Sequence, residues 1–221
     1  MLRSTLFQKL KGYLVLVLQV FLVLPFLLQG HGELIFNAVK GVDQYPWVSM
    51  NAYNLWYYFV DHPMETQDTI KFAGLTYKNW GLLMFCGFSA LVLGPFLKDI
   101  WNHWKADKEP AYLVERICLT SGLVMIGFFY FNTQMHERYG HAAMLFFACY
   151  GYISGRYWLF FLLSIAYVLN LEDVLMWLHL KNYSILLLQP WFISTLWLVT
   201  MVLGTGMLCR HHYKALVHEP A

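Results

Sequence analysis

The sequence predicts an all-α, polytopic membrane protein with about six transmembrane helices. Of its 221 residues, 59% are hydrophobic, 19% are aromatic and only 13% are charged, and the mean hydropathy is +0.47. A soluble domain has about 25% charged residues and about 45–50% apolar residues. Disordered chains combine few aromatic residues with a high net charge, whereas the formal net charge here is only +2. This small charge also excludes a nucleic-acid-binding protein built on a basic face.

Six apolar stretches predict the helices, because a spanning helix needs about 20 mostly apolar residues. The first stretch follows three basic residues, as a signal peptide does, but it lacks a small-residue cleavage site and is predicted to be retained. The fourth stretch is short, and Pro190 lies near the start of the sixth. The predicted helices are residues 13–28, 80–97, 113–131, 142–153, 158–169 and 185–209.

Basic residues predict the orientation, since Lys and Arg are enriched in cytoplasmic loops. With six helices, all the basic clusters fall on one side, and both termini are cytoplasmic. These residues are Arg3, Lys9, Lys11, Lys98, Lys105, Lys108, Arg116, Arg156, Arg210 and Lys214. The external segments are then residues 29–79, the turn around His136, and residues 172–184.

The first external segment, residues 29–79, is long and rich in Trp and Tyr. Between Pro46 and Pro63, residues 51–60 are expected to form about two and a half turns of helix. Because Trp and Tyr favour the headgroup region, this aromatic segment is predicted to be re-entrant or to lie at the membrane interface. Residues 1–221 as a whole are expected to form a single membrane domain.

Ionisable residues cluster where one apolar helix ends and the next begins, at His136, Glu137, Arg138 and His141. Such groups at membrane depth are costly and often functional. The alternative is an interfacial role, in which Arg138 extends to the headgroups and pairs with Glu137 while Tyr139 joins the aromatic belt. The two histidines are five residues apart, whereas the zinc motif His-Glu-x-x-His places them four apart. Neither a metal site nor a cofactor is therefore predicted.

Amide and aromatic side chains adjoin one another at Asn51, Tyr53, Asn54 and Trp56. Amides hydrogen-bond to hydroxyl groups, and aromatic rings stack on the C–H faces of sugars, so this pattern favours a sugar site. An ordinary interfacial helix with an Asn cap accounts for the same composition. Both interpretations stay open on the residues alone.

These two stretches together resemble the GT-C superfamily of glycosyltransferases, which are polytopic membrane enzymes that use polyprenyl-phosphate-linked sugars. Asn51-Ala-Tyr-Asn-Leu-Trp56 is similar to the Asn-Ala-x-Asn-x-Trp segment of a late external loop in that superfamily. Gln134-Met-His-Glu-Arg-Tyr139 is similar to its bacterial Met-His-Glu-Arg-Tyr motif. The order and spacing of the two motifs match, and the resemblance covers roughly residues 24–221.

The resemblance implies transfer of a hexose from a polyprenyl-phosphate donor to an acceptor on the periplasmic or lumenal side. His136, Glu137 and Arg138 would be catalytic; His136 and Arg138 would contact the donor phosphate, and Glu137 would orient one of them. The residues expected to bind the sugar or the acceptor are Asn51, Asn54, Trp56 and Tyr139. The chain and its lipid ligand would lie in the bacterial inner membrane, or in the endoplasmic reticulum membrane of a eukaryote.

The resemblance also implies that a catalytic part is missing. Enzymes of this superfamily have an N-terminal half whose first external loop carries an Asp or Glu that deprotonates the acceptor. Asp43 and Asp61 do not occupy that loop, so whether the chain is an enzyme by itself stays open. The expected explanations are a split subunit with a separate N-terminal-half partner, a truncated gene product or a misplaced start codon. The alternative is a non-catalytic membrane subunit or scaffold that binds lipid or a partner helix bundle.

Overall fold

The computed structural model describes residues 17–18, 20–21, 24–30, 32–33, 45–105, 113–179 and 185–217. The chain divides into two compact units, Met1–Tyr45 and Pro46–Ala221. In the first unit, residues 17–18, 20–21 and 24–28 are helical. The rest of the predicted helix 13–28 lies outside the described residues, as does Asp43. The candidate site lies in the second unit.

The described part of the second unit is mostly helical. Its five α-helices are α3 (Tyr77–Lys105), α4 (Leu113–Phe131), α5 (His141–Ser154), α6 (Trp158–Leu175) and α7 (Pro190–Val217). Four stretches are long and apolar enough to cross a membrane, which is the character of an integral membrane protein. They are Tyr77–Lys98, Leu113–Phe131, Trp158–Leu175 and Pro190–Arg210.

Helix α5 differs from its neighbours in length. It has 14 residues, and at 1.5 Å per residue it is about 21 Å long. The hydrocarbon core of a bilayer is about 30 Å thick, so α5 is too short to cross it without local adaptation. Among the described residues, four of the six expected spans are thus helices of sufficient length, while the first expected span lies largely outside these residues.

Helix α4 is the central element of the second unit, because it packs against α3, α5 and α7. Its residues Leu119, Leu123 and Ile126 recur at helical spacing and are fully buried. At its end, the Phe129 ring lies 4.6 Å from the ring of Trp197 in α7, centroid to centroid. Helix α3 exposes its leucines instead, which suits a helix that faces lipid.

Residues 46–76 form a compact group of short elements before α3, here called the cap. These elements are β1 (Ser49–Met50), the 3₁₀ helix η1 (Leu55–Tyr58), β2 (Lys71–Phe72) and β3 (Leu75–Thr76). Strands β2 and β3 form an antiparallel hairpin. Its turn has positive φ at both Ala73 and Gly74, as a two-residue hairpin turn requires in order to match the right-handed twist of its strands.

The helix predicted for residues 51–60 is wrong in extent, because only the single 3₁₀ turn η1 is helical. Asn51 has a left-handed backbone with φ 62°, which interrupts a right-handed helix. Tyr53 and Trp56 are 7% and 2% exposed. These two side chains are buried in the second unit, whereas Tyr58 and Phe59 are 41% and 57% exposed.

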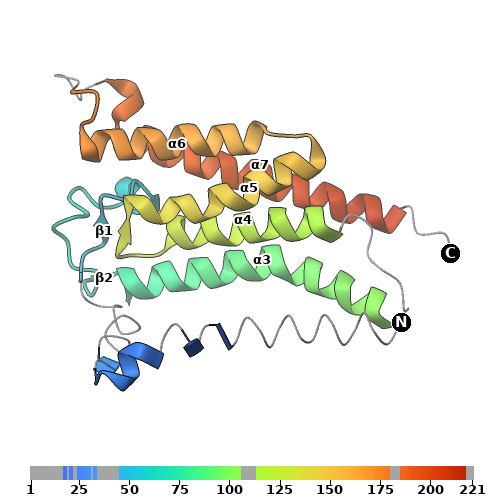
Figure 1. The fold of residues 1–221 in the computed structure, drawn as a ribbon. Helices are drawn as coiled ribbons and strands as arrows, with labels where there is room; N and C mark the ends of the chain where they lie inside the picture. The colour runs from blue at the N-terminus through green and yellow to red at the C-terminus, as the bar shows by residue number, and fades with distance from the viewer. Residues whose placement is uncertain are drawn as a thin grey trace. The chain divides into compact units, whose positions relative to one another are not determined.

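Four of the basic residues predicted to be cytoplasmic belong to the ends of helices that lie away from the cap (Figure 1). Strand β1 lies beside the start of α3 and the end of α4, whereas Lys105 ends α3 and Arg116 lies in the first turns of α4. Arg156 follows α5, and Arg210 lies late in α7. Lys71 in β2, Lys78 at the start of α3 and Arg138 after the end of α4 lie at the cap end instead, so the basic residues of this unit are not confined to one end.

Candidate functional site

The two motif segments meet in a short strand pair at the end of α4. Strand β1 pairs in parallel with β4 (Met135–His136), with Ser49 opposite Met135 and Met50 opposite His136. Asn51 forms a further bridge to His136. The 3₁₀ helix η2 (Glu137–Gly140) then leads from β4 into α5. Residues selected from two distant parts of the sequence are thus neighbours in space.

Two residues beside this strand pair have an unusual backbone. Asn51 and Gln134 have φ 62° and φ 61°, values that are uncommon for residues other than glycine. Each is held by neighbours: the Asn51 carbonyl accepts a hydrogen bond of 2.8 Å from Asn170 Nδ2, and the Gln134 amide donates to the Trp47 carbonyl at 3.2 Å. Such conformations persist where the surroundings impose them, and they are frequent at functional sites.

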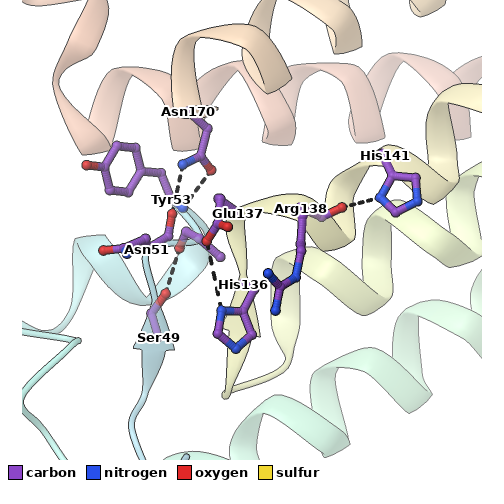
Figure 2. Close-up of polar contacts among 9 residues, drawn as sticks. Ser49, Asn51, Tyr53, His136, Glu137, Arg138, His141 and Asn170 are labelled. Carbon is purple, nitrogen blue, oxygen red and sulfur yellow. Dashed lines mark hydrogen bonds and ion pairs between the residues drawn. The ribbon is translucent and has the colours of Figure 1, made fainter. Parts of the chain in front are cut away.

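The ionisable cluster follows directly from β4. His136 Nδ1 lies 3.9 Å from Glu137 Oε2, and both side chains are 15% exposed. Arg138 is exposed, and its Cζ lies 6.0 Å from the centroid of the Tyr139 ring. The side chains of His136 and Arg138 lie on the same side of the segment (Figure 2). An exposed guanidinium beside an imidazole and a phenol is suited to bind an anion such as phosphate.

Burial and charge set the protonation of His136. Burial lowers its pKa below the ordinary value of 6.5, the Arg138 guanidinium lowers it further, and the Glu137 carboxylate raises it. The net effect is a lower pKa, so the imidazole is neutral near pH 7. Arg138 then supplies the positive charge of this cluster, and His136 offers one hydrogen-bond donor and one acceptor.

Asn54 and Trp56 are directed into the protein. Asn54 is fully buried, and its Nδ2 donates to the carbonyls of Phe129 at 3.3 Å and Asn132 at 3.1 Å. Trp56 Nε1 donates to the Phe131 carbonyl at 3.0 Å. A helix leaves its last carbonyls without intrahelical partners, so these two motif residues cap α4. Their contact with a substrate stays a prediction; their observed contacts hold η1 against α4.

Tyr139 and His141 each contact another residue of the ionisable stretch. Tyr139 is 41% exposed, and its ring meets the His136 ring edge-on at 5.3 Å between centroids. His141 Nδ1 hydrogen-bonds to the Arg138 carbonyl. Tyr139 is therefore exposed beside Arg138, and His141 contacts the backbone carbonyl of Arg138.

Sequence reasoning missed Asp68, which is 1% exposed. Its Oδ2 accepts hydrogen bonds from Thr133 Oγ1 at 2.9 Å and from Gln134 Nε2 at 2.8 Å. This carboxylate therefore fastens the cap to the segment that enters β4. The sequence offers no local signal for this role, because the partners lie more than sixty residues away along the chain.

Sequence reasoning also missed the end of α6. Asn170 is fully buried and contacts the backbone on both sides of Ala52, and Asp173 accepts a hydrogen bond from the Tyr53 hydroxyl. The available signal was the run Asn170-Leu-Glu-Asp173, which breaks an apolar stretch with polar residues. The sequence predicts that the fifth helix ends at residue 169 and that residues 172–184 are an external segment, whereas this run lies in the last turns of α6.

Two further findings bear on the site: the grouping of possible metal ligands, and the similarity of the chain to known proteins. Among the described residues, no three His, Cys, Asp or Glu side chains are grouped so that they could hold a metal ion. The resemblance to the GT-C superfamily rests on the two motif segments and their order along the chain. No protein-family model matches the chain, and no curated protein or solved structure is significantly similar to it.

Proposed function

We propose that this chain is the C-terminal part, or a subunit, of a membrane glycosyltransferase that moves a hexose from a polyprenyl-phosphate donor to an acceptor on the periplasmic or lumenal side. The observation that supports this proposal is the pairing of β1 with β4. It brings the Asn51–Trp56 segment beside the His136–Tyr139 segment, although the GT-C resemblance assigns them to different parts of the chain. In the proposed topology, six helices cross the membrane and both termini are cytoplasmic.

The donor phosphate is bound by Arg138, with His136 beside it. Helix α4 ends at Phe131, so these side chains follow closely after the apolar stretch, at the depth where a membrane-embedded polyprenyl phosphate presents its charge. The guanidinium fork is matched to phosphate oxygens. A bound phosphate anion favours the protonated imidazole, whose two N–H groups let His136 donate to the phosphate while Nδ1 faces Glu137 Oε2, 3.9 Å away.

Asn51 and Tyr139 line the sugar or the acceptor, and Asn54 and Trp56 shape the pocket from behind. In the transfer step, a bond forms between the acceptor oxygen and the anomeric carbon while the bond from that carbon to the phosphate oxygen breaks. The polyprenyl phosphate leaves with the electron pair, and Arg138 stabilises its charge. The acceptor proton passes to a carboxylate that, as the GT-C resemblance implies, lies outside the two motif segments.

The test is binding of undecaprenyl monophosphate to detergent-solubilised wild type, Arg138→Lys and Arg138→Ala. Losing a charge-assisted hydrogen bond costs about 1.5–3 kcal/mol, so Arg138→Ala should weaken binding roughly tenfold to a hundredfold. Arg138→Lys keeps the charge but loses the fork and should fall between the two. Arg156→Ala is the matched control, because Arg156 is also exposed but follows α5 at the opposite end.

Thermal unfolding of the same samples separates binding from folding. If Arg138 only anchors the chain at the interface, Lys should replace it fully, and Arg138→Ala should change the unfolding temperature and not the affinity. Equal affinities for all four proteins would exclude the phosphate role. The chain would then be a non-catalytic membrane subunit that binds lipid or a partner helix bundle.

A further inference from the structure

We propose that Asn170 of α6 is a positioning residue of this site, which holds the strand pair that carries Asn51 and His136. The inference rests on the proposed function, because it concerns the same site. Asn170 is fully buried near the end of α6, and it is 119 residues from Asn51 along the chain. Figure 2 shows its amide reaching across to the backbone of the Asn51–Tyr53 segment.

The two hydrogen bonds of Asn170 require an amide. Its Oδ1 accepts from the Tyr53 backbone N–H at 3.0 Å, and its Nδ2 donates to the Asn51 carbonyl at 2.8 Å. A carboxylate lacks the donor, an ammonium lacks the acceptor, and an aliphatic side chain lacks both. Because buried backbone groups need partners, the residue type at this position is set by the backbone that it meets.

These bonds act on His136 through the strand pair. They flank Ala52 and hold the left-handed Asn51, whose φ is 62°. Met50 and Asn51 are the two residues that pair with His136. If the Asn51 backbone relaxes to a right-handed or extended conformation, the bridge to His136 cannot keep its register. Asn170 therefore fixes the position of a side chain that it does not touch.

A neighbouring residue of α6 supports the same segment. Asp173 accepts a hydrogen bond from the Tyr53 hydroxyl. Residues 170 and 173 are three apart, so they lie on one side of the helix. This side of α6 therefore contacts the Asn51–Tyr53 segment, and η2 packs against the same helix.

Hydrogen–deuterium exchange of the solubilised protein tests the inference without a ligand. In Asn170→Ala, amides of residues 49–53 and 135–138 should exchange roughly tenfold faster or more than in wild type, because the buried bonds that oppose local opening are lost. Amides in the middle of α4 should change less, which separates local release from global destabilisation. Ser194→Ala is the matched control: Ser194 is fully buried and donates to the Asn54 carbonyl at 2.9 Å.

Asn170→Asp provides a second variant that keeps the size of the side chain. As a carboxylate it still accepts from Tyr53 but repels the Asn51 carbonyl; as a protonated acid it donates and accepts like the amide. Exchange of residues 135–138 should therefore be fast at neutral pH and should recover towards the wild-type rate in acid, relative to wild type at each pH. Unchanged exchange at 135–138 in both Asn170 variants, or the same increase in Ser194→Ala, would overturn the positioning role.

Binding of undecaprenyl monophosphate to the same variants distinguishes the two proposals. If both hold, Asn170→Ala should weaken binding by about tenfold, as expected when one hydrogen bond to the phosphate is misplaced, and Ser194→Ala should bind like wild type. If wild type does not bind this lipid, the proposed function fails, while the exchange data still decide whether Asn170 positions β4.

Discussion

Burial and two neighbouring charges together determine the pKa of the His136 imidazole. Arg138→Gln removes one of the two causes that lower its pKa, so the pKa of His136 should rise. Glu137→Gln removes the cause that raises it, so the pKa should fall further. An NMR titration of protein labelled at histidine, with the His136 signal assigned from His136→Gln, measures both shifts. An unchanged pKa of His136 in both variants would show that the two charges do not reach this ring.

The lowered pKa also has a consequence for stability. The folded state binds a proton at His136 less readily than the unfolded state, so protonation favours unfolding as pH falls through about 6.5 and below. Above that pH the neutral imidazole carries no such penalty. The acid-induced loss of stability should therefore be smaller in His136→Gln than in wild type, as measured by thermal unfolding between about pH 5 and pH 8.

Asp68 is a buried acceptor whose removal takes one hydrogen bond from each of two donors. Asp68→Ala should lower the free energy of unfolding by about 1–3 kcal/mol, because the Thr133 hydroxyl and the Gln134 amide lose their shared carboxylate oxygen. Asp68→Asn keeps an acceptor and should cost less. Glu65→Ala, an exposed acidic residue of the same segment, should change stability by no more than about 0.5 kcal/mol. Equal stability of Asp68→Ala and Glu65→Ala would mean that Asp68 does not fasten β4.

At the scale of elements, hydropathy predicts the helices but not the site that they support. Helix α4 has the predicted bounds of 113–131, because its apolar run coincides with its helical run. Helix α6 extends past the predicted end at residue 169 to Leu175, because its polar residues find partners in the cap and not in water. Strands β1 and β4 have two residues each, too few for any periodicity to be read.

The two motif segments could be recognised from sequence by their residue types, yet their contact could not. That contact depends on Asn170, Asp68 and the end of α4, which are distant in the chain and carry no shared pattern. Asn54 and Trp56 also show that residue types alone do not predict which groups a side chain contacts. Their residue types suggest a sugar site, whereas the structure shows their polar atoms bound to the last carbonyls of α4.

The junction between η2 and α5 depends on close packing at Gly140. A Cβ at this position would lie 2.6 Å from Trp197 Cη2, so Gly140→Ala should lower stability by about 1–3 kcal/mol through overpacking. Gly140→Ala combined with Trp197→Phe should recover part of the loss. Gly87→Ala in α3 is the control, because nothing lies within 4 Å of its added Cβ, and a helical Gly→Ala change is neutral or stabilising by up to about 1 kcal/mol. Thermal unfolding in detergent compares them, and a neutral Gly140→Ala would contradict this packing.

At the scale of the whole molecule, the proposed orientation makes a labelling prediction. Helix α3 has 29 residues and is about 43 Å long, and Lys105 and the cap lie at its opposite ends. In a variant with Cys86, Cys118, Cys149 and Cys209 replaced, a cysteine at Tyr139 should react with a membrane-impermeant thiol reagent in intact cells. Cysteines at Lys105 or Lys214 should react only after permeabilisation, which also controls for accessibility. Labelling of position 105 in intact cells, without labelling of position 139, would invert the topology.

The left-handed backbone at Asn51 and Gln134 has a consequence for how motifs carry information. Each of these residues is the first letter of one motif segment, and each has a conformation that costs ordinary L-residues about 1–2 kcal/mol. Asn51→Gly should preserve folding, whereas Asn51→Val or Asn51→Ile should destabilise the fold whatever ligand is bound. Some residues of a motif that resembles a catalytic signature are thus required for the backbone conformation, and others for chemistry. Measuring folding and ligand binding for substitutions across both segments separates the two kinds of residue.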